Sequence, residues 1–187
     1  MRVLAFTGLP GSGKSVAVDA VRARGIPVVR MGEFVLEEVR HRGLTITEEH
    51  IGPVASGMRK EHGDDVWAKR TVEALQDGRI PGVNAGTRLI AVDGIRSLAE
   101  VDRFKRELGH EFVLIAVEAP EHDRHERILG RGRHDDAADR ALVKVRDRRE
   151  AAWGVETAIA RADFRITNDG DMETFVARIT ELLDRLL

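Results

Sequence analysis

Short apolar runs alternate with amphipathic stretches along the whole chain. Runs rich in β-branched and other apolar residues predict five strands, at 2–7, 26–31, 89–93, 112–117 and 162–168. Apolar residues recur at helical spacing over eight further stretches, at about 16–24, 33–42, 47–58, 65–77, 97–108, 120–130, 139–153 and 172–186. Strands that alternate with helices favour an α/β fold in which a parallel sheet carries helices on both faces.

Two segments have signatures that are more specific than periodicity. The run 112–117 is apolar throughout, which predicts a central strand covered on both faces. Ser97 and Glu100 stand three residues apart at the start of an amphipathic stretch and predict a helical capping box. Because no repeat or linker-like segment separates the elements, we expect a single domain over residues 1–187.

The composition narrows the class of protein. Hydrophobic residues make up 42% of the chain, and a net charge of -2 with a pI near 6.4 argues against general nucleic-acid binding. No cysteine is present for a disulfide or a thiolate metal site. No apolar run approaches the roughly 20 residues of a membrane span, and Gly8 and Pro10 interrupt the start too soon for a signal peptide. We therefore expect a cytoplasmic protein without nucleic-acid or membrane partners.

The stretch 8–15 reads GLPGSGKS and fits the phosphate-binding pattern G-x-x-x-x-G-K-[ST] at every fixed position. It lies between a predicted strand and a predicted helix, as the motif requires, and a turn that binds nothing has no need of the lysine. Glycines let the backbone close around an anion, Lys14 reaches the β- and γ-phosphates, and the Ser15 hydroxyl helps to hold Mg²⁺. We expect nucleotide contacts from Gly8, Pro10, Gly11, Ser12, Gly13, Lys14, Ser15 and Val16.

Asp93 ends the apolar run 89–93. Ligands of open α/β sheets bind at the carboxyl ends of the strands, and in P-loop proteins an acid there acts on Mg²⁺ or its waters. The alternative is that Asp93 and Gly94 merely form a turn, as Asp-Gly pairs often do. The phosphate loop in the same chain favours a catalytic and metal-binding role for Asp93, and Mg²⁺ is the one metal that we expect.

Arginines are frequent after residue 120, and most are expected on solvated helix faces. Arg131 and Arg133 differ because they flank a glycine in a polar stretch that predicts an exposed loop. A mobile lid at about 130–140 would bring both over a transferring phosphoryl group, neutralise its charge and exclude water. Arg146 and Arg149 stand three residues apart on one predicted helix face and extend the same anionic pocket as substrate contacts.

Several segments together resemble an archaeal P-loop family of adenylate-kinase-like and dephospho-CoA-kinase-like proteins. They read GLPGSGKS, RMGEFVLEEV, VDGIRSLAEVDRF, RGRHDD, RDRREAAWGV and ADFRITNDG, and they extend over nearly the whole chain. The resemblance implies the nucleoside monophosphate kinase fold, with three layers, a five-stranded parallel sheet, an acceptor-side helical region at about 33–79 and a small arginine-bearing lid. It also favours ATP as the nucleotide.

The same resemblance implies residues for the phosphate acceptor. Gly32 and Glu33 resemble the Gly-Asp segment that lines the acceptor site of adenylate kinases. The segment DGIR, which ends at Arg96, is similar to the Asp-Gly-x-x-Arg segment whose arginine holds the acceptor phosphate, shortened by one residue. We therefore expect Gly32, Glu33 and Arg96 to contact the acceptor.

Two departures from these families leave the acceptor open. Adenylate kinases carry an arginine three residues after the acid of the Gly-Asp segment, where this chain has Leu36, so that ligand is missing or replaced by Arg40 or Arg59. Dephospho-CoA kinases resemble the end of the chain, where Asn168 and Gly170 would line the adenine pocket. The Asp-x-Asp that those enzymes carry after the second strand has no counterpart in the residues MGE.

Three classes of function follow. We favour a kinase that moves the γ-phosphoryl group of Mg-ATP to a small nucleotide-like acceptor, with dephospho-CoA-kinase-like activity as the alternative within that class. A P-loop ATPase is the second class, although Asp93 is followed by glycine and not by an acid that could activate water. A nucleotide sensor that engages a protein partner is the third. The sequence leaves the acceptor and the oligomeric state open.

Overall fold

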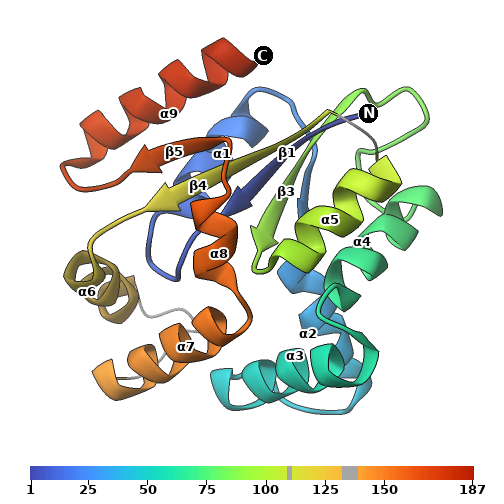
Figure 1. The fold of residues 1–187 in the computed structure, drawn as a ribbon, viewed down its shortest axis with the longest axis vertical. Coiled ribbons are helices and arrows are strands. Elements are labelled where there is room, and N and C mark those ends of the chain that lie inside the picture. The colour runs from blue at the N-terminus through green and yellow to red at the C-terminus, as the bar shows by residue number, and fades with distance from the viewer. Residues whose placement is uncertain (109–110, 132–138) are drawn as a thin grey trace.

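The structure, a computed structural model, describes residues 1–108, 111–131 and 139–187, apart from the side chain of Arg131. In these residues five parallel strands form one sheet in the order β2-β3-β1-β4-β5 (Figure 1). Their bounds are Arg2–Thr7 for β1, Val28–Arg30 for β2, Leu89–Ile95 for β3, Phe112–Glu118 for β4 and Phe164–Thr167 for β5. The predicted five-stranded parallel sheet is confirmed.

Helices cover both faces of this sheet and the end at which its strands finish (Figure 1). One face carries α1 (Lys14–Ala23) and α9 (Met172–Leu186). The other carries α5 (Leu98–Leu108) and α8 (Val155–Ala160), with α4 (Val66–Gln76) beside α5. The remaining helices lie toward the carboxyl ends of the strands, and they are α2 (Met31–His41), α3 (Glu48–His62), α6 (Glu121–Arg131) and α7 (Arg140–Ala152).

The central strand β1 explains why the core has two halves. Val3 and Ala5 point into the apolar cluster beneath α5 and α8, whereas Leu4 and Phe6 point into the cluster beneath α1 and α9. All four are essentially buried. A parallel strand covered on both faces reads as a continuous apolar run, which is the pattern that the sequence shows there.

Three local details differ from the prediction. β3 continues past Asp93 to Ile95, because Gly94 takes a left-handed φ of +108° and forms an irregularity in the ladder with β1 instead of ending the strand. The second strand ends at Arg30 and α2 already begins at Met31, two residues before the helix predicted from about 33. Gly154, with a φ of +97°, separates α7 from α8, a helix that periodicity did not predict.

The predicted capping box at the start of α5 is confirmed. Ser97 Oγ accepts from the Glu100 backbone N–H at 3.2 Å, and Glu100 Oε2 accepts from the Ser97 N–H at the same distance. This arrangement places the Glu100 carboxylate, which is fully buried, behind the end of β3. None of the helices in the described part of the chain combines the length and apolar content needed to cross a membrane.

Candidate active site

The phosphate loop, residues 8–15, connects β1 to α1. Its φ angles are +78° at Gly11 and +105° at Gly13, in the left-handed region that favours glycine. A Cβ on Gly11 would lie 2.4 Å from the carbonyl oxygen of Arg124, and one on Gly13 would lie 2.5 Å from the side-chain nitrogen of Asn168. Glycine is required at both positions because α6 and the segment after β5 pack directly on the loop backbone.

Side chains of α6 and α7 hold this loop from outside. Arg124 donates to the Pro10 carbonyl at 2.9 Å and makes two hydrogen bonds to Asp147, at 3.0 and 2.8 Å. His125 Nε2 lies 2.9 Å from the same carboxylate. Burial alone would raise the pKa of Asp147, but hydrogen bonds from Arg124 and His125 hold it below its usual range. The loop is therefore tied to α7 through an ionised carboxylate.

Lys14 folds over the loop, and its acceptors are neutral. Its Nζ donates to the carbonyl oxygens of Gly8 at 2.5 Å and Leu9 at 3.1 Å. The pKa of Lys14 is lowered to about 7, chiefly by desolvation and then by the positive charge of Arg96, against the raising effect of nearby carboxylates. A phosphate bound in the loop would raise this pKa, because it stabilises the protonated amine.

Asn168 and Gly170, which the family resemblance assigns to the adenine pocket, follow β5. Asn168 is buried, its side-chain nitrogen donates to the Ser12 carbonyl at 2.9 Å, and its backbone N–H donates to the Glu118 carbonyl at 2.7 Å. Arg127 Nη2 lies 3.3 Å from both oxygens of Asn168. Gly170 is exposed. Asn168 thus supports the phosphate loop, and contacts of these two residues with a base stay a prediction.

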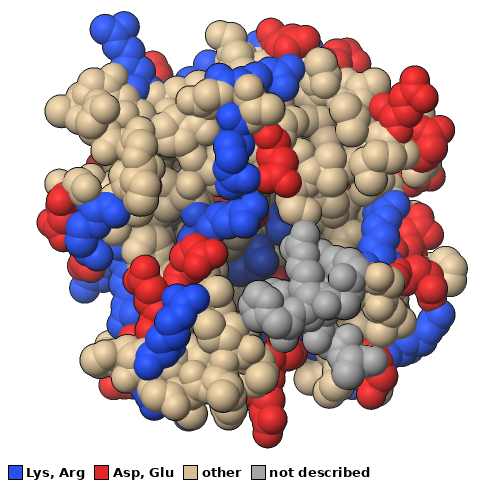
Figure 2. All heavy atoms as spheres, turned by 180° about the vertical axis from the view of Figure 1, so that it is seen from behind, with Lys and Arg blue, Asp and Glu red and all other residues tan. Residues whose placement is uncertain are grey.

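The phosphate loop opens into a cavity of about 360 Å³, a size typical of small-molecule sites. Lysine and arginine atoms lie at the bottom of a hollow in the middle of one face, among acidic side chains (Figure 2). The predicted site residues that line the cavity are Pro10, Gly11, Ser12, Gly13, Lys14, Ser15, Gly32, Glu33, Arg59, Asp93, Arg96, Arg146 and Arg149. Gly8 and Val16 belong to the loop region but are outside this lining. Residues from distant parts of the sequence are therefore brought to one cavity.

Ser15 and Asp93, the predicted Mg²⁺ contacts, both line this cavity. Ser15 follows Lys14 in the first turn of α1. The Asp93 side chain is 20% exposed, and its Oδ2 lies 3.9 Å from Nε of Arg30. A hydroxyl and a carboxylate, together with nucleotide phosphates, are the oxygen ligands that Mg²⁺ prefers. The donor set therefore fits a magnesium ion that arrives with the nucleotide.

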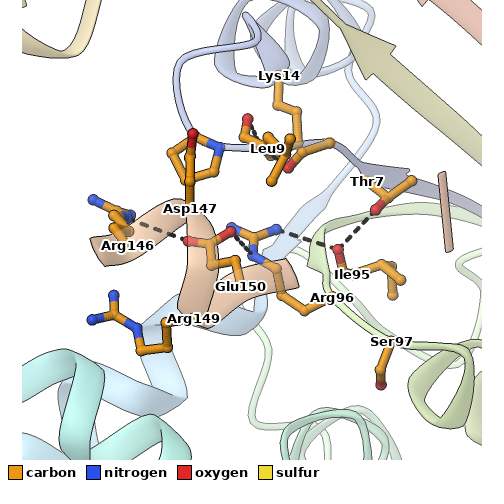
Figure 3. A network of polar contacts seen from close by, with 12 residues as sticks. Thr7, Leu9, Lys14, Ile95, Arg96, Ser97, Arg146, Asp147, Arg149 and Glu150 are labelled. Carbon is orange, nitrogen blue, oxygen red and sulfur yellow. Dashed lines mark hydrogen bonds and ion pairs between the residues drawn. The ribbon is translucent and has the colours of Figure 1, made fainter. Parts of the chain in front are cut away.

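Glu150, which sequence reasoning missed, lies between two of the predicted acceptor arginines. Arg96 Nε is 2.8 Å from Glu150 Oε2, and Arg146 Nε is 3.3 Å from Oε1 (Figure 3). The Glu150 side chain is 3% exposed, and burial alone would raise its pKa. The charges of Arg96, Arg146 and Lys14 hold that pKa below its usual range. Glu150 is therefore a weak base that positions arginines.

Arg149 lies on the same helix but points away from Glu150 (Figure 3). Its Nη2 donates to Glu48 Oε1, and Arg146 Nη1 lies 3.6 Å from Glu48 Oε2. The spacing of four between Arg146 and Glu150 is a sequence signal that could have indicated their pairing. Glu48 and Arg149 are 101 positions apart in the sequence, which leaves no comparable signal.

Arg59 lies in the cavity wall, but its donors point into the protein. Nη1 donates to the Asp64 carbonyl and Nη2 to Glu100 Oε1, each at 2.5 Å. The guanidinium also lies 5.0 Å from the ring centre of Trp153, another residue that sequence reasoning left out of the site. Burial raises the pKa of Glu100 in spite of this arginine. Arg59 stabilises a buried acid, and its contact with an acceptor stays a prediction.

The other predicted site residues fall into two groups. Gly32 and Glu33 are exposed in the first turn of α2 and line the cavity. Arg133 lies outside the described residues, as does the side chain of Arg131, whose backbone ends α6. The arginine-bearing lid therefore stays a prediction.

Comparisons with known proteins bear on this site. Residues 7–142 match a family described as an AAA domain, AAA_17. The chain is 40% identical over 187 residues to a UPF0200 protein of Methanosarcina barkeri, with 100% of this chain and 97% of the relative covered. It is 38% identical over 186 residues to a UPF0200 protein of Thermococcus onnurineus, with 99% and 98% covered. It is 44% identical over 186 residues to a UPF0200/UPF0201 protein of Archaeoglobus fulgidus, but spans only 56% of that relative's length.

Solved structures show the same fold. TT1252 from Thermus thermophilus is similar with a TM-score of 0.70 at 19% identity, with 100% of this chain and 97% of that chain covered. Shikimate kinase from Bacteroides thetaiotaomicron is similar with a TM-score of 0.53 at 14% identity, with 99% and 98% covered. These likenesses concern the fold alone, and they confirm the predicted P-loop kinase fold. The narrower likeness to adenylate and dephospho-CoA kinases stays a prediction.

Proposed function

The chain belongs to the UPF0200 family, and we propose that it is an ATP-dependent phosphotransferase that moves the γ-phosphoryl group of Mg-ATP to a small nucleotide-like acceptor. The observation that carries this proposal is that one cavity joins the phosphate loop to a cluster of arginines, namely Arg96 directly after β3 and Arg146 and Arg149 on α7. The loop suits the phosphates of the donor, and the arginines suit the anionic group of a second molecule. Hydrolysis or sensing of ATP does not require such a cluster of arginines beside the loop.

In the proposed reaction an ionised phosphate oxygen of the acceptor attacks the γ-phosphorus, so the nucleophile has no proton to lose. The bond from that phosphorus to the β,γ-bridging oxygen breaks, and ADP leaves with the electron pair. Lys14 offsets the negative charge on the phosphates, while Arg96 and Arg146 orient the acceptor. Mg²⁺, when bound at Ser15 and Asp93, neutralises phosphate charge.

The chemistry of Glu150 argues against hydrolysis as the main activity. An acid that activates water works best with a pKa near the working pH, whereas Arg96 and Arg146 hold the pKa of Glu150 below its usual range. The arginines around it instead favour binding of a second anion. A dephospho-CoA-kinase-like enzyme would share the donor site and differ in the acceptor, so one assay separates these alternatives.

The test is to measure ADP formed from Mg-ATP with AMP, GMP, CMP, UMP or dephospho-CoA, and to quantify the phosphorylated acceptor in the same reaction. We expect one acceptor to raise ADP release and to be phosphorylated in equal amount. Slow ADP release that is indifferent to every acceptor would overturn the proposal in favour of an ATPase or sensor. Lys14→Met should lose the phosphoryl transfer, and Lys60→Met is its matched control because Lys60 is exposed and lies outside the cavity lining.

A further inference from the structure

Glu48 links the two walls of the cavity. It is the first residue of α3, and the ion pairs that join α3 to α7 in the described structure both use its carboxylate. One oxygen accepts from Arg149, and the other lies 3.6 Å from Nη1 of Arg146. In the ribbon these two helices face each other beyond the carboxyl ends of the strands (Figure 1). Glu48 therefore places an acid among the arginines that face the phosphate loop.

The guanidinium of Arg149 contacts the backbone of α3, the ring of Trp153 and the carboxylate of Glu48. A Cβ on Gly52 would lie 2.2 Å from Arg149 Nη1, so the guanidinium rests directly on the backbone of α3. It also lies 5.5 Å from the ring centre of Trp153, within range of a cation–π interaction. Its Nε is buried without a hydrogen-bond partner. Among the described residues, Glu48 is the charged partner of this guanidinium.

The two acids of the cluster differ in how firmly they are held. Glu150 is 3% exposed and lies in the last turns of α7, where it relies on Arg96 and Arg146. Glu48 is 16% exposed and lies in the first turn of α3, where the helix dipole stabilises a carboxylate even without an arginine. Glu150 is therefore a resident anion, whereas Glu48 can release its arginines at modest cost.

The charges of the cluster fit this difference. The guanidiniums of Arg96, Arg146 and Arg149 would be balanced by Glu150 and one dianionic phosphate. If Glu48 stayed in contact with Arg149, the incoming phosphate would meet a like charge. Exchange of one anion for another avoids that repulsion and preserves the partners of both arginines.

We propose that Glu48 is a specificity-determining residue, an internal anion that holds the place of the acceptor's phosphate at Arg149 and Arg146 and is displaced when that phosphate binds. This inference rests on the proposed function, since it requires the cavity to take a phosphorylated acceptor. Acceptors that bring a dianion compete with Glu48 better than neutral or singly charged ones. The wild-type affinity for the acceptor is lowered by the fraction of molecules in which Glu48 occupies the arginines.

The test measures phosphate binding after the loop has been filled. Wild type and Glu48→Gln are saturated with Mg²⁺ and the non-transferable analogue AMP-PNP and titrated with inorganic phosphate, with AMP or with acetate by calorimetry. We expect Glu48→Gln to bind phosphate and AMP about tenfold more tightly, which corresponds to Glu48 occupying the arginines about nine-tenths of the time. Acetate, a single negative charge, should gain less.

Two variants serve as controls. Glu49→Gln makes the same change at an exposed neighbour in the same helical turn, outside the cavity lining, and should leave phosphate affinity unchanged. Gly52→Ala places a methyl group against Arg149, so it should weaken phosphate binding while α3 stays folded, because Gly52 has ordinary helical geometry.

The outcomes separate this inference from the proposed function. Unchanged or weaker phosphate binding by folded Glu48→Gln would overturn the exchange of anions, and weaker binding would mean that Glu48 only positions Arg149. If AMP-PNP fails to bind to the wild type, the proposed function fails first. If the wild type binds AMP-PNP but Glu48→Gln binds phosphate no more tightly than the wild type does, the inference is contradicted and the proposed function is not.

Discussion

The phosphate loop and the arginine cluster are both suited to anions, but they are built by opposite means. The loop is eight consecutive residues whose backbone N–H groups and Lys14 supply the positive potential, and the acceptors of Lys14 are neutral carbonyls. The cluster gathers Arg96 from the residue after β3 and Arg146 and Arg149 from α7, and acids of the same chain already pair with these side chains. In the loop, Lys14 is hydrogen-bonded to neutral groups and has no carboxylate ion pair among the described residues, whereas the arginines of the cluster are already ion-paired with carboxylates.

This difference shows what controls each site. Phosphate affinity in the loop depends on backbone shape and on one amine, so any change there is expected to weaken it. Affinity in the cluster depends on a balance between arginines and acids, so loss of an acid destabilises the fold or strengthens anion binding. Burial of the acid decides which, because Glu150 is 3% exposed and Glu48 is 16% exposed, whereas the exposure of Arg96, Arg146 and Arg149 is similar.

The largest expected effect comes from Lys14→Met. Loss of the amine should reduce phosphoryl transfer about a thousandfold, roughly 4 kcal/mol of transition-state stabilisation, while the fold is preserved. Steady-state assays of acceptor phosphorylation measure the first effect, and far-UV circular dichroism measures the second. Turnover close to the wild-type level would contradict the dependence of the loop on this single amine.

Glu150→Gln should have the next largest effect, on stability. Arg96 and Arg146 would lose a buried counter-charge, and we expect unfolding to become easier by about 3 kcal/mol, the lower end for breaking a buried pair because both arginines are partly exposed. Urea unfolding measures this free energy, and Glu156→Gln, an exposed acid on α8, is the matched control.

Acidification gives an independent check on Glu150. Its folded-state pKa is lowered, so the stability that it contributes is present above the ordinary value of 4.5 and is lost as the pH falls through the lower folded-state pKa. The difference in unfolding free energy between wild type and Glu150→Gln should therefore shrink in acid. A difference that is absent at pH 7 would mean that the cluster does not need its resident anion.

Gly11→Ala tests the dependence of the loop on backbone shape. The new methyl group would meet the Arg124 carbonyl at 2.4 Å in a left-handed backbone conformation, so we expect a loss of about 2 kcal/mol in stability and weaker ATP binding. Gly57→Ala is the control, because Gly57 has open space and helical geometry in α3. Equal unfolding midpoints for the two variants would argue against close packing of the loop backbone on α6.

The smallest expected effect is the uptake of a proton with the nucleotide. The pKa of Lys14 is about 7 in the free protein, so the amine is mostly neutral at pH 8 and becomes charged when a phosphate binds. Mg-ADP binding should then take up about one proton at pH 8 and almost none at pH 6. Calorimetry in buffers of different ionisation enthalpy measures this number, and Lys14→Met should abolish it. Equal uptake by the variant would assign the proton to another group.

The same pKa fixes the sign of a stability effect without nucleotide. Between pH 10.5 and about 7, Lys14 is mostly protonated in the unfolded chain and mostly neutral in the folded chain. Protons therefore favour the unfolded chain in this window, and the free energy of unfolding falls as the pH is lowered through it. Lys14→Met should remove this dependence. The effect concerns the loop alone, since the arginines of the cluster stay charged throughout.

Much of the fold could be predicted because each element has a local signature. The apolar runs of β1 and β4, the capping box of Ser97 and Glu100 and the stripe of α9 all lie where the pattern indicates. The errors arose where tertiary context overrides a local signal. Gly94 reads as a turn but is accommodated in the β3 ladder, and α8 is a short helix that packs on the sheet beside α5.

The sequence by itself determined the phosphate loop, because its function lies in consecutive residues whose backbone turns around an anion. It also indicated Arg146 and Arg149 by their spacing on one helix face, and Arg96 by its resemblance to a segment of adenylate kinases. Only the tertiary structure decided which acids face them, since Glu48 and Glu150 reach these arginines through the packing of α3, α7 and the end of β3. The Coulomb energy of an ion pair depends on the distance between the charges and on their burial, and both are set by tertiary packing.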